Sequence, residues 1–582
     1  MLLPLQAFAS LTTLAFLKIP EVIESLTSRK YSGYSSQPYF LSKQKLSKIN
    51  ETFLGVCEDV VLANPAVLSW GLILHTIAEL ATEDKETREQ VQLNTAIDSF
   101  QSNIQHAGSS QGLEHSLWED LLDCARTPIH TAEESIVILT SDPVKESVFN
   151  TITILSSKIG SMSAVDDGLT ARWIRLCLID SIRLAIMYLE YTDVVESVLA
   201  ILDDDDSGFS RDLDSLGPAS DPKCVFAKDR FLMDSIFNVA RSRFPYETSP
   251  FLRLCRVLVS GHSWNEDGLP EILDEVENMQ SFTQIMEPHF QGYATIREDE
   301  DANFVALLQP LPMFEVASRH QHSERASSNA LVVSGSSQLP TQTIGQVISD
   351  SKPAVIKWVH QYSCLSFLGS WLEEWSENGG QSPGWTDDTG TDIIALLTEL
   401  IANSKTSSTE ATSGKRILEL ASDGLSKQGD IISVVFDIFE RNLQNIGSRG
   451  DPTKCSSAAM ACLGFIKALI KVLPSRVWPF LGRSSFIGSD GKGGMMSAII
   501  SAMEVPSGEY PFLVSCVDFV EAVVDDAASR AVLRKSPSSV SSKSSIASDW
   551  SAGIPSHVMR NILLNFTRVM VEIFNSNGSW RF

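Results

Sequence analysis

Basic residues are scarce in this sequence. Lys and Arg number 46 against 72 Asp and Glu, which gives a formal net charge of −26 at pH 7. Surfaces that wrap nucleic acid or anionic lipid need clustered Lys and Arg, because such binding releases counterions. The charge balance therefore argues against direct nucleic-acid or anionic-membrane binding and favours basic partners or solubility.

Sequence signatures of catalysis are also missing. There is no nucleophile elbow, no H-E-x-x-H motif and no paired-carboxylate signature. The nine cysteines are scattered and include no C-x-x-C pair, which favours a reducing compartment over a zinc or redox site. A triad built from distant residues would leave no local signature. The sequence predicts no catalytic, cofactor-binding or metal-binding residue.

Long hydrophobic runs are absent as well. No run of 18 or more uninterrupted apolar residues occurs, so the sequence predicts no transmembrane segment. The first 17 residues carry no charge, but they lack the basic n-region and the small-x-small cleavage site of a secretory signal. We therefore expect a buried helix at the start of the chain.

Most of the chain consists of amphipathic helical segments. In residues 171–191 an apolar stripe recurs with the helical period; its members are Ile174, Leu178, Ile182, Ala185 and Leu189. Similar segments lie at 249–261, 431–445, 456–473, 511–525 and 557–575. In the first of these, Ser249 is expected as the N-cap, Pro250 as the first helical residue and Gly261 just past the end.

Chain length and helix pattern together predict an extended, mainly α-helical fold. A single hydrophobic core stops growing at about 250–300 residues, and this chain has 582. Many amphipathic helices without βαβ alternation favour an irregular α-solenoid, a superhelix of the HEAT or armadillo kind.

A different pattern occupies residues 289–362. Alternating apolar and polar residues in 344–347 and 355–359 flank a turn at 349–353, as in a β-hairpin. The stretches "GYATIRE" (292–298) and "NALVVSG" (329–335) are further strand candidates. Four or five short strands suffice for a small barrel, with Trp358 in its core. We expect a first solenoid part at 1–288, the β insertion at 289–362 and a second solenoid part at 363–582.

The acidic run at 203–222 resembles a calcium loop. Asp203, Asp205, Ser207, Gly208 and Asp214 fall at positions 1, 3, 5, 6 and 12 of an EF-hand pattern. Position 8 is Ser210 where an apolar residue is expected, and position 12 lacks the bidentate Glu. A solvated acidic loop is the better interpretation.

Three other motifs also favour structural interpretations. The Gly-rich loop at 488–496 fails the phosphate-loop spacing, with Phe486 at the first Gly position and Gly493 where Ser or Thr is needed. His320 and His322 have no further ligands nearby in the sequence, so exposure in a loop is expected. Trp371 and Trp375, four residues apart on an expected helix, indicate packing.

Five stretches resemble segments of one protein family in the same order along the chain. The hairpin "TIGQV" and "AVIKW" (343–358), set between helices, resembles the SH3-like insertion of inner-ring scaffold nucleoporins of the nucleoporin-188 family. The others are "NPAVLSWGLILHTI" (64–77), "FPYETSPFLRLCRVLVSG" (244–261), "PSRVWPFLGRSSFI" (474–487) and "PSGEYPFLVSCVDFVEAVV" (506–524). Family members are much longer, so the resemblance implies an internal piece, from the N-terminal to the middle region.

The resemblance implies a structural role without catalysis or cofactor. Family members are scaffold components of the nuclear pore complex inner ring at the nuclear envelope, and they serve mRNA and protein transport between nucleus and cytoplasm. Expected partners are other nucleoporins, including a linker nucleoporin whose binding region is expected outside this chain, so no binding residue is assigned. Phe-Gly repeats and transport receptors are further candidates.

Other interpretations remain open at this point. A karyopherin-like nuclear transport receptor is the main alternative, because such receptors are also acidic α-solenoids; it predicts binding of a small GTPase or of Phe-Gly repeats, and the β insertion weighs against it. An enzyme with a helical regulatory body would need a convergent polar site, which the sequence does not reveal. The sibling family of large inner-ring nucleoporins is also solenoidal, and the hairpin favours the nucleoporin-188 family.

Overall fold

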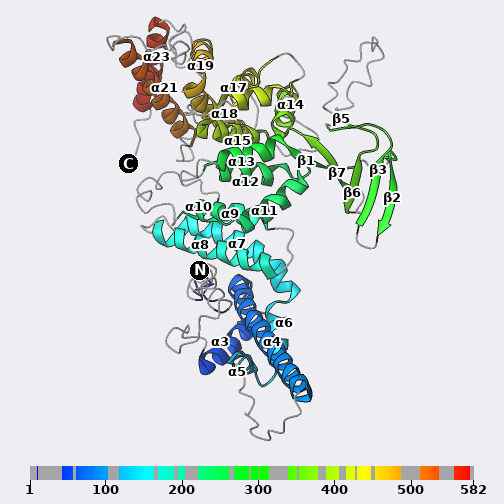
Figure 1. Ribbon diagram of the computed structural model, residues 1–582. Helices are drawn as coiled ribbons and strands as arrows, with labels where there is room; N and C mark the ends of the chain where they lie inside the picture. Colours follow the sequence, from blue (N-terminus) through cyan, green and yellow to red (C-terminus); the bar gives the residue numbers. More distant parts are fainter. Residues whose placement is uncertain are drawn as a thin grey trace. The chain divides into compact units, whose positions relative to one another are not determined.

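The chain divides into two compact units, Met1–Val239 and Ala240–Phe582, with the boundary inside α11 (Arg230–Arg243). The computed structural model describes residues 42–56, 60–101, 117–162, 168–188, 194–202, 221–260, 268–286, 290–299, 302–313, 338–349, 353–377, 389–404, 414–425, 429–446, 452–486, 511–535 and 556–576, with a few positions between 9 and 26 (Figure 1).

The first unit is helical in its described residues. Its helices are α3 (Lys43–Val56), the 3₁₀ turn η2 (Val61–Ala63), α4 (Asn64–Gln101), α5 (Leu117–Asp123), α6 (Ala132–Leu139), α7 (Asp142–Met162), α8 (Gly168–Tyr188), α9 (Val195–Leu202) and α10 (Pro222–Lys228). The long helix α4 packs against α5, α6, α7 and α8. In its second turn Trp70 stacks on Phe53 and donates its indole N–H to Asn50, with 3.2 Å between Nε1 and Oδ1.

The second unit contains a stack of helices in two rows. Its helices are α12 (Thr248–Ser260), α13 (Gly268–Glu277), α14 (Cys364–Glu377), α15 (Thr389–Asn403), α16 (Gly414–Ser422), α17 (Ile431–Ile446), α18 (Pro452–Val472), α19 (Pro474–Leu481), α21 (Pro511–Lys535) and α23 (Ser556–Ser576). Helices α12, α15, α18 and α21 contact one another in that order, and α14 contacts α16 and α17 in the neighbouring row. Successive helix layers are the packing of an α-solenoid. The prediction of a mainly α-helical solenoid is confirmed.

The start of α12 differs by two residues from the sequence expectation. The helix begins at Thr248, so Ser249 lies inside its first turn instead of capping it. Thr248 Oγ1 donates to the Pro245 carbonyl at 2.6 Å, and the Ser249 hydroxyl donates to Asp392 of α15. The Ser249 hydroxyl therefore joins two helices, because a neighbouring carboxylate competes with the local cap. Gly261 lies outside the described residues.

Between α13 and α14 the chain forms a five-stranded antiparallel sheet. Its order is β1 (Met279–Ile285), β7 (Val355–Tyr362), β6 (Ile344–Ser349), β3 (Ala302–Leu307) and β2 (Tyr293–Asp299). The short strands β4 (Leu311–Pro312) and β5 (Gln338–Leu339) pair separately. Figure 1 shows β1 and β7 beside the helices, with β2 and β3 farther out. The expected start at residue 289 misses β1, whereas the expected hairpin is β6 and β7.

The core face of the sheet is centred on Trp358, which is completely buried as predicted. Trp358 of β7 lies opposite Gly345 of β6. A Cβ at Gly345 would lie 2.6 Å from Cε3 of Trp358, so only glycine leaves room for the indole across β6. The candidate strand at 329–335 lies outside the described residues.

Two helical stretches, Val61–Val91 and Cys455–Val472, are long and apolar enough to cross a membrane by length and composition. Neighbouring parts of the protein bury 78% of the apolar window in the first stretch and 56% in the second. Such burial is typical of core helices, which can be equally long and apolar. Near the start of the chain the described positions are helical, and Leu17, Val22 and Leu26 are buried.

Candidate functional site

The described residues form no group of three or more His, Cys, Asp and Glu side chains that could hold a metal ion. The buried thiols are also poorly suited to nucleophilic chemistry. Burial raises the pKa of Cys177 to about 12, and it raises the pKa values of Cys255, Cys364 and Cys462 well above their ordinary range. A thiol that stays protonated is a weak nucleophile. The candidate functional features in this part of the chain are therefore the contacts that join its helices and strands, and the surfaces that those contacts keep in position.

The first junction, here called the α19 junction, comprises α19 and the residues up to Phe486. Trp478 is completely buried and donates its indole N–H to Asp526 of α21, with 2.9 Å between Nε1 and Oδ2. On the other side, Ser485 donates its backbone N–H to Glu440 of α17 at 3.2 Å, and the Ser484 hydroxyl donates to the same carboxylate. One short segment thus bonds to two long helices.

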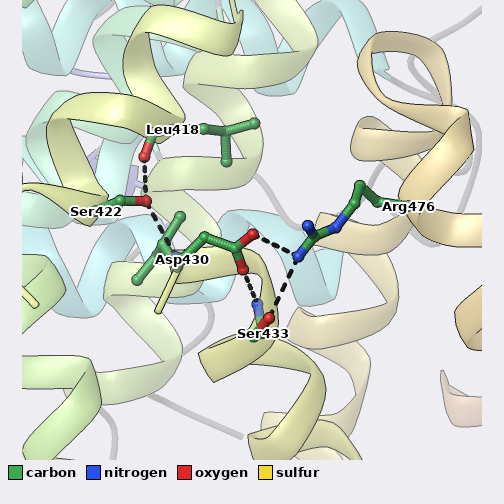
Figure 2. Close-up of polar contacts among 6 residues, drawn as sticks. Leu418, Ser422, Asp430, Ser433 and Arg476 are labelled. Atoms are coloured by element: carbon green, nitrogen blue, oxygen red, sulfur yellow. Dashed lines mark hydrogen bonds and ion pairs between the residues drawn. The ribbon is translucent and has the colours of Figure 1, made fainter. Parts of the chain in front are cut away.

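A polar cluster ties the start of α19 to α16 and α17 (Figure 2). Asp430 precedes α17 and accepts the backbone N–H of Ser433 at 2.8 Å, which satisfies a free donor of the first helical turn. Its other oxygen accepts from Arg476 of α19, whose Nη2 also donates to the Ser433 hydroxyl at 3.3 Å. Ser422 at the end of α16 accepts the N–H of Ile431 at 3.1 Å. The cluster fixes where α17 begins relative to both neighbours.

Aromatic packing supplies the apolar part of the α19 junction. Phe480 stacks on Phe436 of α17 with 3.8 Å between ring centroids. Phe486 is completely buried and meets Phe439, Phe519 and Phe566, which come from α17, α21 and α23. Edge-to-face pairs of this kind add stability beyond the area that they bury. Phe486, which broke the phosphate-loop pattern in the sequence, is a core residue.

The second junction, here called the sheet junction, joins the β insertion to the helical stack. Phe282 of β1 and Tyr362 of β7 both pack edge-on against Phe367 of α14, with ring centroids 5.6 and 5.9 Å away. Phe367 also contacts Phe244, which packs on Phe251 of α12. The aromatic cluster therefore runs from both ends of the insertion into two helices.

Hydrogen bonds reinforce the sheet junction. Thr283 of β1 donates its backbone N–H to the Phe244 carbonyl at 3.0 Å and its hydroxyl to the Ser242 carbonyl at 2.6 Å. Arg416 of α16 donates to Glu277 at the end of α13 at 3.1 Å. Because the completely buried Thr283 pairs both of its donors with carbonyls of residues 242–244, β1 has a defined attachment to the helices.

The other residues singled out in the sequence divide into two sets. Trp371 and Trp375 are 3% and 7% exposed and stack at 6.2 Å, so the packing interpretation is confirmed. The calcium-like run from Asp203 to Asp214, His320, His322 and Gly493 lie outside the described residues, and those expectations stay predictions. Sequence reasoning missed the role of α19, although "PSRVWPFLGRSSFI" carries the signal of three aromatic side chains beside paired serines.

Comparison with known proteins covers the insertion and both helical parts. Residues 297–353 match the family described as Nup188 SH3-like domain, and residues 355–582 match Nucleoporin Nup188, N-terminal subdomain III. Nucleoporin NUP188 of Chaetomium thermophilum is 26% identical over 612 residues, covering 100% of this chain and 32% of that protein. Nucleoporin nup184 of Schizosaccharomyces pombe is 24% identical over 302 residues, covering 51% of this chain and 18% of that protein.

The chain thus spans about a third of the length of the Chaetomium relative. The SH3-like match begins inside β2, and the second match begins at the first residue of β7 and continues through the helices of the α19 junction. The sequence resemblance, the helical stack with its sheet and the collinear matches agree: residues 297–353 and 355–582 are domains of the nucleoporin Nup188 family, and the whole chain is similar to a member of that family.

Proposed function

We propose that this chain is part of a structural scaffold component of the nuclear pore complex inner ring, located at the nuclear envelope and acting through protein–protein contacts. The observation that carries the proposal is the match to a curated nucleoporin over the whole chain, across helices and insertion alike. A helical stack with polar and aromatic junctions supports it, because such a body presents surfaces in fixed positions.

The proposal extends to absence of catalysis and to partners. We infer that function rests on binding surfaces of a first helical part, a β insertion starting at Met279 and a second helical part from Ser363. Other nucleoporins are the proposed partners, including a linker nucleoporin whose binding region lies outside this chain. Phe-Gly repeats and transport receptors are secondary candidates. An amphipathic partner helix would gain affinity by burying apolar anchors in a groove of the stack.

Localisation and exchange kinetics of the full-length protein test the proposal. A fluorescent fusion is expected to mark the nuclear rim and to recover slowly after photobleaching, because a scaffold subunit stays in place. Co-purification with other nucleoporins at moderate salt is the expected biochemical result. Rapid recovery, nucleoplasmic signal and direct binding of a small GTPase would contradict the scaffold role and favour the karyopherin-like alternative.

A further inference from the structure

The sheet has an outer face opposite the one that holds Trp358. Gly345 pairs with Trp358, and Gln346 pairs with Lys357. Because successive side chains of a strand point to opposite faces, Ile344, Gln346, Lys357 and Val359 point away from the Trp358 side. We call these four residues the outer sheet face. Ala306 and Phe304 of β3 continue it, since they pair with Ile344 and Gln346.

Apolar side chains on this face are exposed to solvent. Val359 is 68% exposed and Ile344 is 49% exposed. They lie on adjacent strands, each one residue beyond the paired Gly345 and Trp358, and the Cβ atoms of facing residues on such strands lie about 5 Å apart. Single exposed apolar residues are ordinary, but an adjacent pair continued by Ala306 and Phe304 is the kind of patch that marks a contact surface.

Lys357 borders the apolar pair. Lys357 is half-buried, and burial lowers its pKa, with the nearby Arg241 charge lowering it further. The neighbouring arginines each have an acid: Arg241 pairs with Glu275, and Arg243 pairs with Glu247 at 3.2 Å. Among the residues that the structure describes, no carboxylate pairs with Lys357.

The charge pattern indicates what chemistry fits this face. The chain carries 72 acidic residues, yet the four residues of the outer sheet face are one amine, one amide and two apolar side chains. A carboxylate brought beside Lys357 would remove the cost of holding a partly desolvated, unpaired cation near Arg241. An apolar side chain next to it would cover Ile344 and Val359.

We propose that the outer sheet face is a docking surface for a short segment of a partner protein that combines apolar side chains with adjacent carboxylates. The apolar residues of the segment lie on Ile344 and Val359, and a carboxylate pairs with Lys357. The overall negative charge of the chain disfavours a second copy as the occupant. This proposal does not depend on the nuclear pore role, because it concerns the chemistry of the segment.

Site-specific photo-crosslinking of the full chain in cells tests the proposal. A photo-reactive phenylalanine analogue replaces Val359, and the crosslinked peptide is sequenced by mass spectrometry. The same analogue in place of Val514 of α21, which is 59% exposed on another surface, is the matched control. We expect the Val359 position to capture a segment with apolar residues beside Asp or Glu, and the Val514 position not to capture it.

Charge variants then measure the role of Lys357 with a synthetic peptide of the captured segment. Lys357→Met keeps the apolar stem and is expected to weaken binding about five- to tenfold, whereas Lys357→Arg retains the charge and most of the affinity. Unchanged thermal unfolding of both variants shows that the fold is intact. Capture of a second copy of this chain, capture of a basic or purely polar segment, no capture at all, or equal binding by Lys357→Met would each overturn the proposal.

Discussion

The indole N–H of Trp478 in α19 donates a hydrogen bond to the Asp526 carboxylate of α21 across 48 positions of the sequence. Trp478→Phe removes this donor and part of the buried ring. We expect the local stability of α21 to fall by about 1–3 kcal/mol, because a bond to a charged group is lost and a small cavity remains. Hydrogen exchange of α21 amides should become about tenfold faster or more. Trp173→Phe, at a side chain that is 47% exposed, is the control; unaltered exchange in α21 of the Trp478 variant would contradict the prediction.

Gly369 of α14 is expected to tolerate no side chain. A Cβ at this position would lie 1.9 Å from the Ala421 carbonyl oxygen of α16, and a backbone atom cannot move aside cheaply. Gly369→Ala should destabilise the second unit by about 1–3 kcal/mol or more, because the two helices must separate.

Gly464 provides the matched comparison in α18. Its nearest neighbour would be Cγ2 of Thr398 at 3.7 Å, which is an ordinary contact. Gly464→Ala should be neutral or stabilising by up to about 1 kcal/mol, since alanine favours the helix. Thermal unfolding and soluble yield compare the two variants, and equal effects would contradict the close approach of α14 and α16.

At the polar cluster of Figure 2 the helix cap should matter more than the ion pair. Asp430→Ala removes the side-chain acceptor of the Ser433 N–H together with the ion pair to Arg476, and is expected to cost about 0.5–2 kcal/mol. Arg476→Met removes the Arg476–Asp430 ion pair, whose side chains are 46% and 34% exposed, and the long hydrogen bond to the Ser433 hydroxyl, and it should cost under about 1 kcal/mol. Hydrogen exchange at the start of α17 measures both, and a larger effect for the Arg476 variant would refute this ranking.

Thiol reactivity should separate the cysteines by burial. Burial raises the pKa values of Cys255, Cys364 and Cys462, so at pH 8 these thiols remain protonated in the folded protein. We expect iodoacetamide to spare them and to modify Cys455, which is partly exposed. Raising the pH to 9 should leave the buried three unlabelled until denaturant is added. Labelling of Cys364 in the native protein would contradict the sheet junction.

The helices were predictable because their apolar periodicity is set locally. The segments expected at 431–445 and 557–575 correspond to α17 and α23 within a residue at each end. The segment expected at 511–525 stops short of the end of α21 at Lys535, because its later turns carry the polar run Asp525 and Asp526. Apolar periodicity reveals the part of a helix that has a buried stripe, but it does not predict a continuation of the helix whose side chains face solvent.

Strand β1 escaped prediction for a different reason. Ser281, Phe282 and Thr283 are all buried. One face of β1 belongs to the core face of the sheet, and its other face lies against residues 242–245. A register shift between Met279 and Ser281 breaks the alternation further. Because both faces of β1 are covered, its sequence does not alternate between apolar and polar residues. Only Asn278 separates α13 from β1, so no turn signal marks the start of the strand.

The α19 junction was beyond sequence reasoning because its partners are distant in the chain. Asp430, Glu440 and Asp526 lie about 45 residues from the side chains that they accept hydrogen bonds from. From sequence alone, an isolated Asp or Glu on a helix is assigned to the exposed face, unless the packing of its neighbours is known. Their role follows from tertiary structure alone.

The two ends of the β insertion lie side by side, with Met279 opposite Tyr362. The helical path therefore leaves α13 and resumes at α14 from nearly the same point, and the sheet is a side branch of that path. Insertions and deletions at the tips of β2 and β3 leave the register of the helices unchanged. Such an arrangement lets the sequence of the β insertion evolve at a different rate from that of the helical stack. Related chains can therefore differ in the partners that the insertion binds and still share the same helical stack.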